Sequence, residues 1–307
     1  MSPLRGIALK VASVVVFVAM ATCIKFARET IPPGETAFFR SFFAIPVILV
    51  WLWRTGDLAS GLRARNPLSH VWRGLIGTAA MTLGFAGLGL LPFPEVTAIG
   101  YAAPLLTVIF AAMFLGERVR SFRIAAVVIG LVGVLIVLSP RLGAFTDGSV
   151  EPEETLGAMV VLMSAVFGAM ASTFVRRLVQ TESTSAIVFW FSVTASILSL
   201  ITVPFGWAMP SPLTALLLVL SGIFGGLGQI FLTASYRHAD AGVIAPFEYT
   251  SMIFTVVIGW FIFSEQPSST TLYGAVLVIA AGILIIWRER ALGLERNKQR
   301  QAATPGG

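Results

Sequence analysis

The sequence predicts an all-α membrane protein with ten transmembrane helices, arranged as two inverted five-helix repeats with both termini in the cytoplasm. Three observations lead to this fold class. Hydrophobic residues make up 56% of the chain and charged residues 12%, whereas a soluble domain carries about 25% charged residues. The apolar residues form ten continuous runs, and most basic residues lie in alternate gaps between them. Finally, two long stretches of the chain resemble one another at a constant spacing.

The ten apolar runs have about the length of 20 helical residues that crosses a hydrocarbon core. They are continuous rather than alternating, and an open sheet edge could not satisfy its hydrogen bonds in lipid, so strands are excluded. Arg5 and Lys10 precede the first run, but no small-residue cleavage site follows, so we expect this run to be a retained span. The predicted spans are residues 7–27, 35–54, 72–91, 95–115, 122–139, 155–176, 185–206, 213–235, 241–263 and 269–287.

Short connections with proline and glycine separate these spans. The longest connection, 139–155, contains four acidic residues and divides the chain near its middle. We therefore predict a first repeat at 1–140, an extracytoplasmic acidic linker at 141–154, a second repeat at 155–288 and a polar cytoplasmic tail at 289–307.

The basic residues predict the orientation. With both termini inside, 17 of the 21 lysine and arginine residues belong to the cytoplasmic side, Lys10 and Arg73 among them. Lys25, Arg28 and Arg141 fall outside, and Arg40 falls within a span. This bias predicts an N-in, C-in topology.

The internal repeat is clearest between Thr97–Glu117 and Ala245–Glu265, where tyrosine, threonine and glutamate recur at an offset of 148. One chemically important position differs, because Gly100 in the first copy corresponds to Glu248 in the second. Each repeat holds five spans, and an odd number requires the halves to lie in the membrane with opposite orientation. Inverted repeats are a device of transporters.

The two five-helix repeats and the closing Leu115-Gly116-Glu117 and Phe263-Ser264-Glu265 resemble the drug/metabolite transporter superfamily, specifically its EamA-type ten-helix members. The resemblance covers nearly the whole chain and implies a multi-pass protein of the bacterial inner membrane. It also implies a central cavity lined mainly by the first, third, fourth, sixth, eighth and ninth spans. The structural motif of the family is then Gly116, Glu117, Ser264 and Glu265, with Ser264 in place of the usual glycine. We expect the two glutamates to cap the next helix rather than to contact substrate.

Glu248 is the leading candidate for a substrate-site residue. It lies about 10 Å inside its span at 1.5 Å per residue, where an ionisable group normally faces a cavity or a partner. It can bind a substrate ammonium group or carry a coupling proton, and the alternative is a structural pair with a neighbouring helix. Tyr101 and Tyr249 are related by the repeat and either line the same cavity or anchor the helices at the interface.

The remaining candidates are polar or aromatic residues and two prolines. Arg40 lies inside its span and either binds a substrate carboxylate or pairs with an acidic neighbour, whereas Lys25 either contributes to the cavity or extends to the headgroups. Pro104 and Pro246 leave a helix carbonyl unpaired and act either as hinges or as static kinks. Further cavity candidates are Trp190, Gln229 and Tyr236.

The sequence offers no catalytic residues, no metal site, no cofactor site and no nucleic-acid surface. Its two histidines, His70 and His238, lie far apart without metal-ligand spacing, and the single Cys23 excludes an internal disulfide. The leading functional interpretation is a secondary transporter that exports amino acids or related compounds by alternating access, as a monomer or a homodimer. The alternatives are uptake of a larger cofactor-like metabolite, such as a flavin or S-adenosylmethionine, and, more remotely, a polytopic membrane enzyme.

Overall fold

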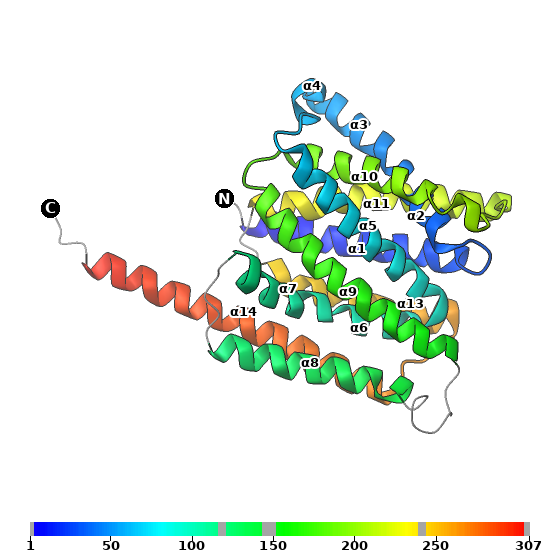
Figure 1. The fold of residues 1–307 in the computed structure, drawn as a ribbon. Coiled ribbons are helices and arrows are strands. Elements are labelled where there is room, and N and C mark those ends of the chain that lie inside the picture. Colours follow the sequence, from blue (N-terminus) through cyan, green and yellow to red (C-terminus); the bar gives the residue numbers. More distant parts are fainter. Residues whose placement is uncertain (1–2, 116–120, 143–151, 239–243, 304–307) are drawn as a thin grey trace.

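A computed structural model describes residues 3–115, 121–142, 152–238 and 244–303, and all regular structure in these residues is helical (Figure 1). The first half of the chain contains α1 (Pro3–Ala27), α2 (Pro33–Phe42), α3 (Ala44–Thr55), α4 (Leu58–Gly61), α5 (Pro67–Leu90), α6 (Phe93–Gly100), α7 (Ala102–Leu115) and α8 (Ser121–Leu142). The second half contains α9 (Pro152–Leu178), α10 (Thr184–Leu200), η2 (Val203–Phe205), α11 (Pro212–His238), η3 (Ala245–Thr250), α13 (Ser251–Phe263) and α14 (Ser269–Ala303).

Six of these helical segments are long and apolar enough to cross a membrane, and four shorter apolar helices complete a set of ten. The shorter four are Ile124–Pro140, Thr184–Leu200, Phe247–Phe263 and Ser269–Ile285. Each of the ten segments overlaps one of the ten predicted spans, in the same order, and the all-α membrane fold class is confirmed. Both termini of the described chain lie at the same end of the bundle (Figure 1), as an even number of spans requires. Which end faces the cytoplasm remains a prediction from the basic residues.

Proline interrupts several spans and explains where the structure departs from simple helices. The second span divides at Phe43, because Pro46 cannot donate a hydrogen bond to the carbonyl four residues earlier. The fourth span divides in the same way at Tyr101, three residues before Pro104. In the ninth span, Pro246 stands in the 3₁₀ turn η3 that precedes α13. Its side chain lies outside the described residues.

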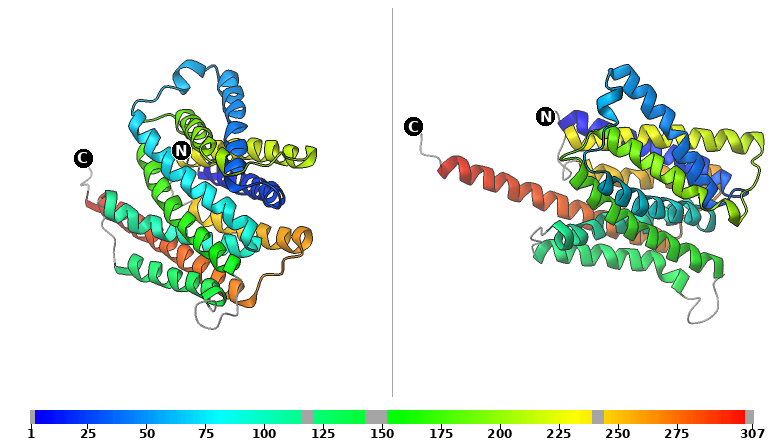
Figure 2. Two further views of the ribbon diagram at one scale, coloured as in Figure 1. Left: turned by 45° about the vertical axis from the view of Figure 1, so that its right-hand side comes forward. Right: turned by 45° about the horizontal axis from the view of Figure 1, so that its top comes forward.

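Two segments differ from their predicted extent. The seventh span is predicted to reach residue 206, but α10 ends at Leu200 and a separate 3₁₀ turn follows around Pro204. The segment after residue 288 is predicted to be a polar tail, and the backbone instead continues as helix α14 to Ala303. This helix extends well beyond the bundle in Figure 1 and in the right-hand view of Figure 2.

The closest helix pairs join the two halves of the chain. Helix α1 packs along α11, α5 along α9, and α8 along α14 (Figure 1). Small residues permit these close approaches: a side chain at Gly133 on α8 would meet the Gly274 carbonyl on α14 at 2.9 Å. The largest buried apolar cluster is built from α6 to α9 together with η3, α13 and α14, so it too draws on both halves.

Candidate functional site

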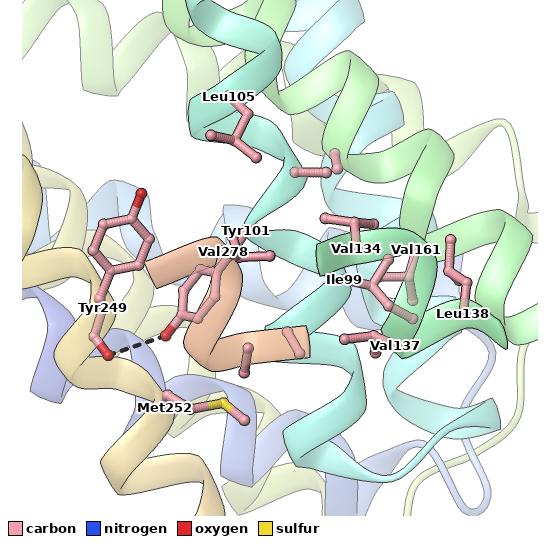
Figure 3. Packing of buried hydrophobic residues seen from close by; sticks show 14 of the residues in the cluster. Ile99, Tyr101, Leu105, Val134, Val137, Leu138, Val161, Tyr249, Met252 and Val278 are labelled. Atoms are coloured by element: carbon pink, nitrogen blue, oxygen red, sulfur yellow. Dashed lines mark hydrogen bonds between the residues drawn. The ribbon is translucent and has the colours of Figure 1, made fainter. Parts of the chain in front are cut away.

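Tyr101 and Tyr249 pack against each other at one side of this cluster (Figure 3). Their rings lie edge to face, with centroids 5.1 Å apart and planes at 76°. The Tyr101 hydroxyl donates to the Tyr249 carbonyl at 3.2 Å and shares a hydrogen bond of 2.7 Å with the Ser251 hydroxyl. Both side chains are buried, and the tyrosine predicted from each repeat therefore packs against its counterpart.

Two helix discontinuities hold the tyrosines in this position. Tyr101 occupies the turn between α6 and α7, and Tyr249 lies in the 3₁₀ turn η3. Gly282 on α14 passes directly behind the second tyrosine, since a β-carbon at Gly282 would overlap the Tyr249 hydroxyl. The tyrosine pair is thus enclosed by the interrupted parts of two spans and by a glycine of a third.

Glu248, next to the tyrosine pair, forms an ion pair with Lys10 of α1. The Lys10 Nζ and Glu248 Oε2 atoms are 3.0 Å apart. The Lys10 side chain is only 3% exposed, whereas 47% of the Glu248 side chain is exposed. The ion pair joins the first span to the ninth. Because the Glu248 side chain is half-exposed, it remains accessible to a further binding partner.

Lys10 was not expected at this site, because the charge count assigned it to the cytoplasmic end. That orientation stays a prediction, and the structure adds that Lys10, about 10 Å along α1 at 1.5 Å per residue, is buried. Arg73, counted on the same side, is likewise buried, within α5. Both residues stand next to apolar runs, and the charge count alone did not indicate that their side chains are buried.

Lys25 and Glu265 form a second ion pair at the opposite end of α1, with Nζ and Oε1 2.8 Å apart. Lys25 also donates to the carbonyls of Leu88 and Leu91 at 3.2 and 3.0 Å. The other Glu265 oxygen accepts the N–H group of Phe93 at 2.7 Å. Glu265 therefore caps α6, a helix of the other repeat, and the prediction that it caps the next helix is wrong.

The turn before Glu265 has a left-handed backbone. Ser264 ends α13 at φ 56°, and the Glu265 N–H group donates to the Gly259 carbonyl at 2.8 Å. Glycine is the usual residue in this conformation, which explains its usual presence in the motif. Gly116 and Glu117, the first copy of the motif, lie outside the described residues.

The other predicted site residues are dispersed. Arg40 is buried on α2 and donates to the Gly225 carbonyl of α11 at 3.3 Å. The Trp190 indole donates to the Leu62 carbonyl at 3.0 Å, which ties α10 to the loop after α4. Gln229 is half-buried on α11. The side chain of Tyr236 lies outside the described residues.

A further polar contact links the α9–α10 loop to α5. The Glu182 carboxylate accepts the N–H groups of Arg65 and Asn66 at 2.8 to 3.1 Å and lies 3.6 Å from His70 Nε2. Burial acts to raise the pKa of the Glu182 carboxyl, but these N–H donors and His70 outweigh it and hold the pKa below its ordinary value. Within the described residues, no group of three or more His, Cys, Asp and Glu side chains could hold a metal ion.

The sequence model of the EamA-like transporter family matches this chain twice, at residues 4–139 and 155–287. An S-adenosylmethionine uptake transporter of Rickettsia felis is 30% identical over 266 residues, which cover 87% of both chains. A pseudopaline exporter of Pseudomonas aeruginosa is 31% identical over 284 residues, covering 91% of this chain and 95% of the exporter. A solved crystal structure shares the fold at a TM-score of 0.66 and 21% identity, covering 94% of this chain and 98% of the other. The chain is therefore an integral, multi-pass membrane protein that belongs to the EamA-like transporter family.

Proposed function

We propose that this transporter exports amino acids or related zwitterions by alternating access, with Lys10 and Glu248 as the charged groups of the substrate site. The ion pair between these two residues is the observation that carries the proposal. A buried lysine and a half-exposed glutamate offer one group for a substrate carboxylate and one for a substrate ammonium. A zwitterion can replace the pair without leaving either protein charge uncompensated, which would be costly inside a membrane.

The surroundings of the pair suit a compact substrate with an apolar side chain. Glu248 directly precedes Tyr249 in η3, and Tyr101 packs on that tyrosine. Aromatic rings give an apolar side chain a large contact area with few rotatable bonds. The tyrosine pair is closed in this structure, so we propose that substrate entry separates the two rings.

The two ion pairs of α1 supply a basis for alternating access. Lys25 and Glu265, with the rings of Phe26, Phe93 and Phe263 around them, close the end of the bundle that is predicted to face outside. Glu248, by contrast, is half-exposed near the predicted cytoplasmic end. We propose that substrate loads from this side and that the outer pair then opens. Glu248 is also the group that we propose for a coupling proton, because its protonation would release Lys10.

Uptake of a larger metabolite is the second candidate. The Rickettsia relative is named for S-adenosylmethionine uptake and the Pseudomonas relative for export, so relatives at similar identity work in both directions. S-adenosylmethionine carries an amino-acid group that would use the same two charges. The proposed site therefore accommodates either substrate, and the transport direction needs its own measurement.

Counterflow in proteoliposomes tests the proposal with substrates that differ in one charged group. We expect exchange of phenylalanine, and little exchange of phenethylamine or 3-phenylpropionate, which each lack one of the two charges. S-adenosylmethionine in the same assay tests the second candidate. Glu248→Gln should reduce exchange of the zwitterion about tenfold or more, as loss of a charged hydrogen bond predicts. Glu153→Gln, at an exposed position in the first turn of α9, is the matched control. Equal exchange of all three phenyl compounds would contradict a zwitterion site.

A further inference from the structure

Two buried arginine side chains lie against one phenyl ring inside the bundle. Arg40 on α2 is 2% exposed and Arg73 on α5 is 6% exposed. Both guanidinium groups lie over the same phenyl ring, that of Phe191 on α10, with centroid distances of 5.6 Å for Arg40 and 3.6 Å for Arg73. We call Arg40 and Arg73 the arginine pair.

The surroundings of the arginine pair supply too few hydrogen-bond acceptors for its N–H groups. The Nε and Nη1 atoms of both residues are buried and have no hydrogen-bond partner. One bond is present, from Arg40 Nη2 to the Gly225 carbonyl, at a long 3.3 Å. Among the described residues, no carboxylate lies within ion-pair distance of either guanidinium. Two positively charged side chains are therefore buried with unpaired N–H groups, whereas buried polar groups nearly always have a hydrogen-bond partner.

Glycines make room for both side chains. A β-carbon at Gly77 would lie 2.6 Å from Arg73 Nη1 and 2.9 Å from the Phe191 ring. A β-carbon at Gly225 would lie 2.7 Å from Arg40 Nε. Because these glycines belong to α5 and α11, the backbones of two different helices approach the guanidinium groups closely.

Polar groups lie one helical turn before Arg73 on α5. At the predicted cytoplasmic end, a pocket of about 650 Å³ is lined by Arg63, Arg65 and Glu182 among others. Glu182 contacts His70, which lies three positions before Arg73 on the same helix.

We propose that the arginine pair is a binding site for a small monovalent anion, held by the free N–H groups of Arg40 and Arg73 above Phe191. An anion there would accept hydrogen bonds from the buried donors and offset part of the repulsion between the two cations. A free halide and the carboxylate of an organic ion share this chemistry. The site is separate from the proposed zwitterion site, so it stands or fails independently of that proposal.

Thermal unfolding of the purified protein in lipid nanodiscs tests the site without a transport assay. The melting temperature is measured in sodium chloride, sodium acetate and sodium gluconate at constant ionic strength, because a ligand of the folded state raises it. We expect a saturable rise with chloride, acetate or both, relative to the bulky gluconate. A rise with acetate alone assigns the site to carboxylates, and a rise with chloride assigns it to small anions in general. Equal melting in all three salts would overturn the proposal and indicate that water satisfies the arginines.

Variants connect the effect to the residues. Arg73→Gln and Arg40→Gln should each weaken the apparent anion affinity about tenfold or more, the loss expected for a charged hydrogen bond. Arg54→Gln, at an exposed position on α3, is the matched control and should behave like the wild type. Should the arginine variants fail to fold, Gly77→Ala retains both charges while filling the space, and radioactive chloride binding to the wild type needs no variant. Anion dependence that persists unchanged in Arg40→Gln and Arg73→Gln would overturn the assignment.

Discussion

Replacing Glu265 with glutamine should open the end of the bundle that is predicted to face outside. The glutamine oxygen can still accept the Phe93 N–H group, so the substitution removes the charge that Lys25 contacts and leaves the cap of α6 in place. The closed form then loses stability relative to any form in which the two halves separate at this end. The expected result is a shift in population rather than unfolding.

The structure allows the size of this shift to be estimated. The charged atoms of Lys25 and Glu265 are 2.8 Å apart, and their side chains are 11% and 20% exposed. Two unit charges at that distance attract by roughly 6 kcal/mol at an effective dielectric constant of about 20. Desolvation offsets much of this attraction, and Lys25 keeps its bonds to two carbonyls. A net loss of about 2 kcal/mol corresponds to a roughly 30-fold change in the ratio of open to closed molecules.

Electron spin resonance distances between two labels measure this ratio. The single cysteine of the chain makes a cysteine-free background available through Cys23→Ser. Labels at Thr30 and Gln266, which are exposed at the predicted outer end of the two halves, should report longer distances when that end opens. In nanodiscs, Glu265→Gln should increase the long-distance population.

Glu153→Gln is the control, because Glu153 is exposed at the same predicted end and makes no contact in the Lys25–Glu265 network. A double-mutant cycle with Lys25→Met isolates the coupling between the two charges. If Glu265→Gln leaves the distance distribution of a folded protein unchanged, the ion pair does not hold this end closed, and the reasoning is refuted.

Three further results follow from the geometry. Gly282→Ala should displace Tyr249 and cost about 1–3 kcal/mol of stability as overpacking, whereas Gly100→Ala, with open space around the added methyl group, should be nearly neutral in the same thermal melt. The pKa of the Glu182 carboxyl in the folded protein lies below its ordinary value of 4.5, so ionised Glu182 contributes its full stability above pH 4.5 and loses it as the pH falls further. The melting temperature should therefore decline in this acid range, and Glu182→Gln should flatten the decline. Ser264→Gly should raise stability by about 0.5–1 kcal/mol, since it removes the cost of a left-handed conformation; a lower melting temperature would contradict this.

The number and type of the elements were predictable, because a membrane imposes both length and helical structure on every crossing segment. The helix interruptions at Phe43 and Tyr101 were harder to predict, because a proline can either bend a helix or divide it. Which of the two happens depends on the neighbouring helices. The prolines themselves, Pro46 and Pro104, gave the approximate positions.

The candidate site was predicted only in part. Glu248 stood out because an acidic residue is costly within an apolar span, but its partner Lys10 resembled an ordinary basic residue at a helix start. The sequence also could not reveal that Glu265 caps a helix 172 positions earlier, at Phe93. Contacts of this kind depend on which spans pack together, and apolar faces alone do not determine that pairing.

The pairing of helices across the two halves has a consequence for biogenesis. Helix α1 finds its main packing partner in α11, and α8 finds its partner in α14, which holds the tenth span. The first five spans must therefore wait in the membrane with their interfaces unfilled until the second half emerges from the ribosome. Assembly of the bundle becomes a late event that begins after most of the chain has been inserted, and chains arrested near residue 150 should be recognised as incomplete by membrane proteases rather than persist as stable half-proteins.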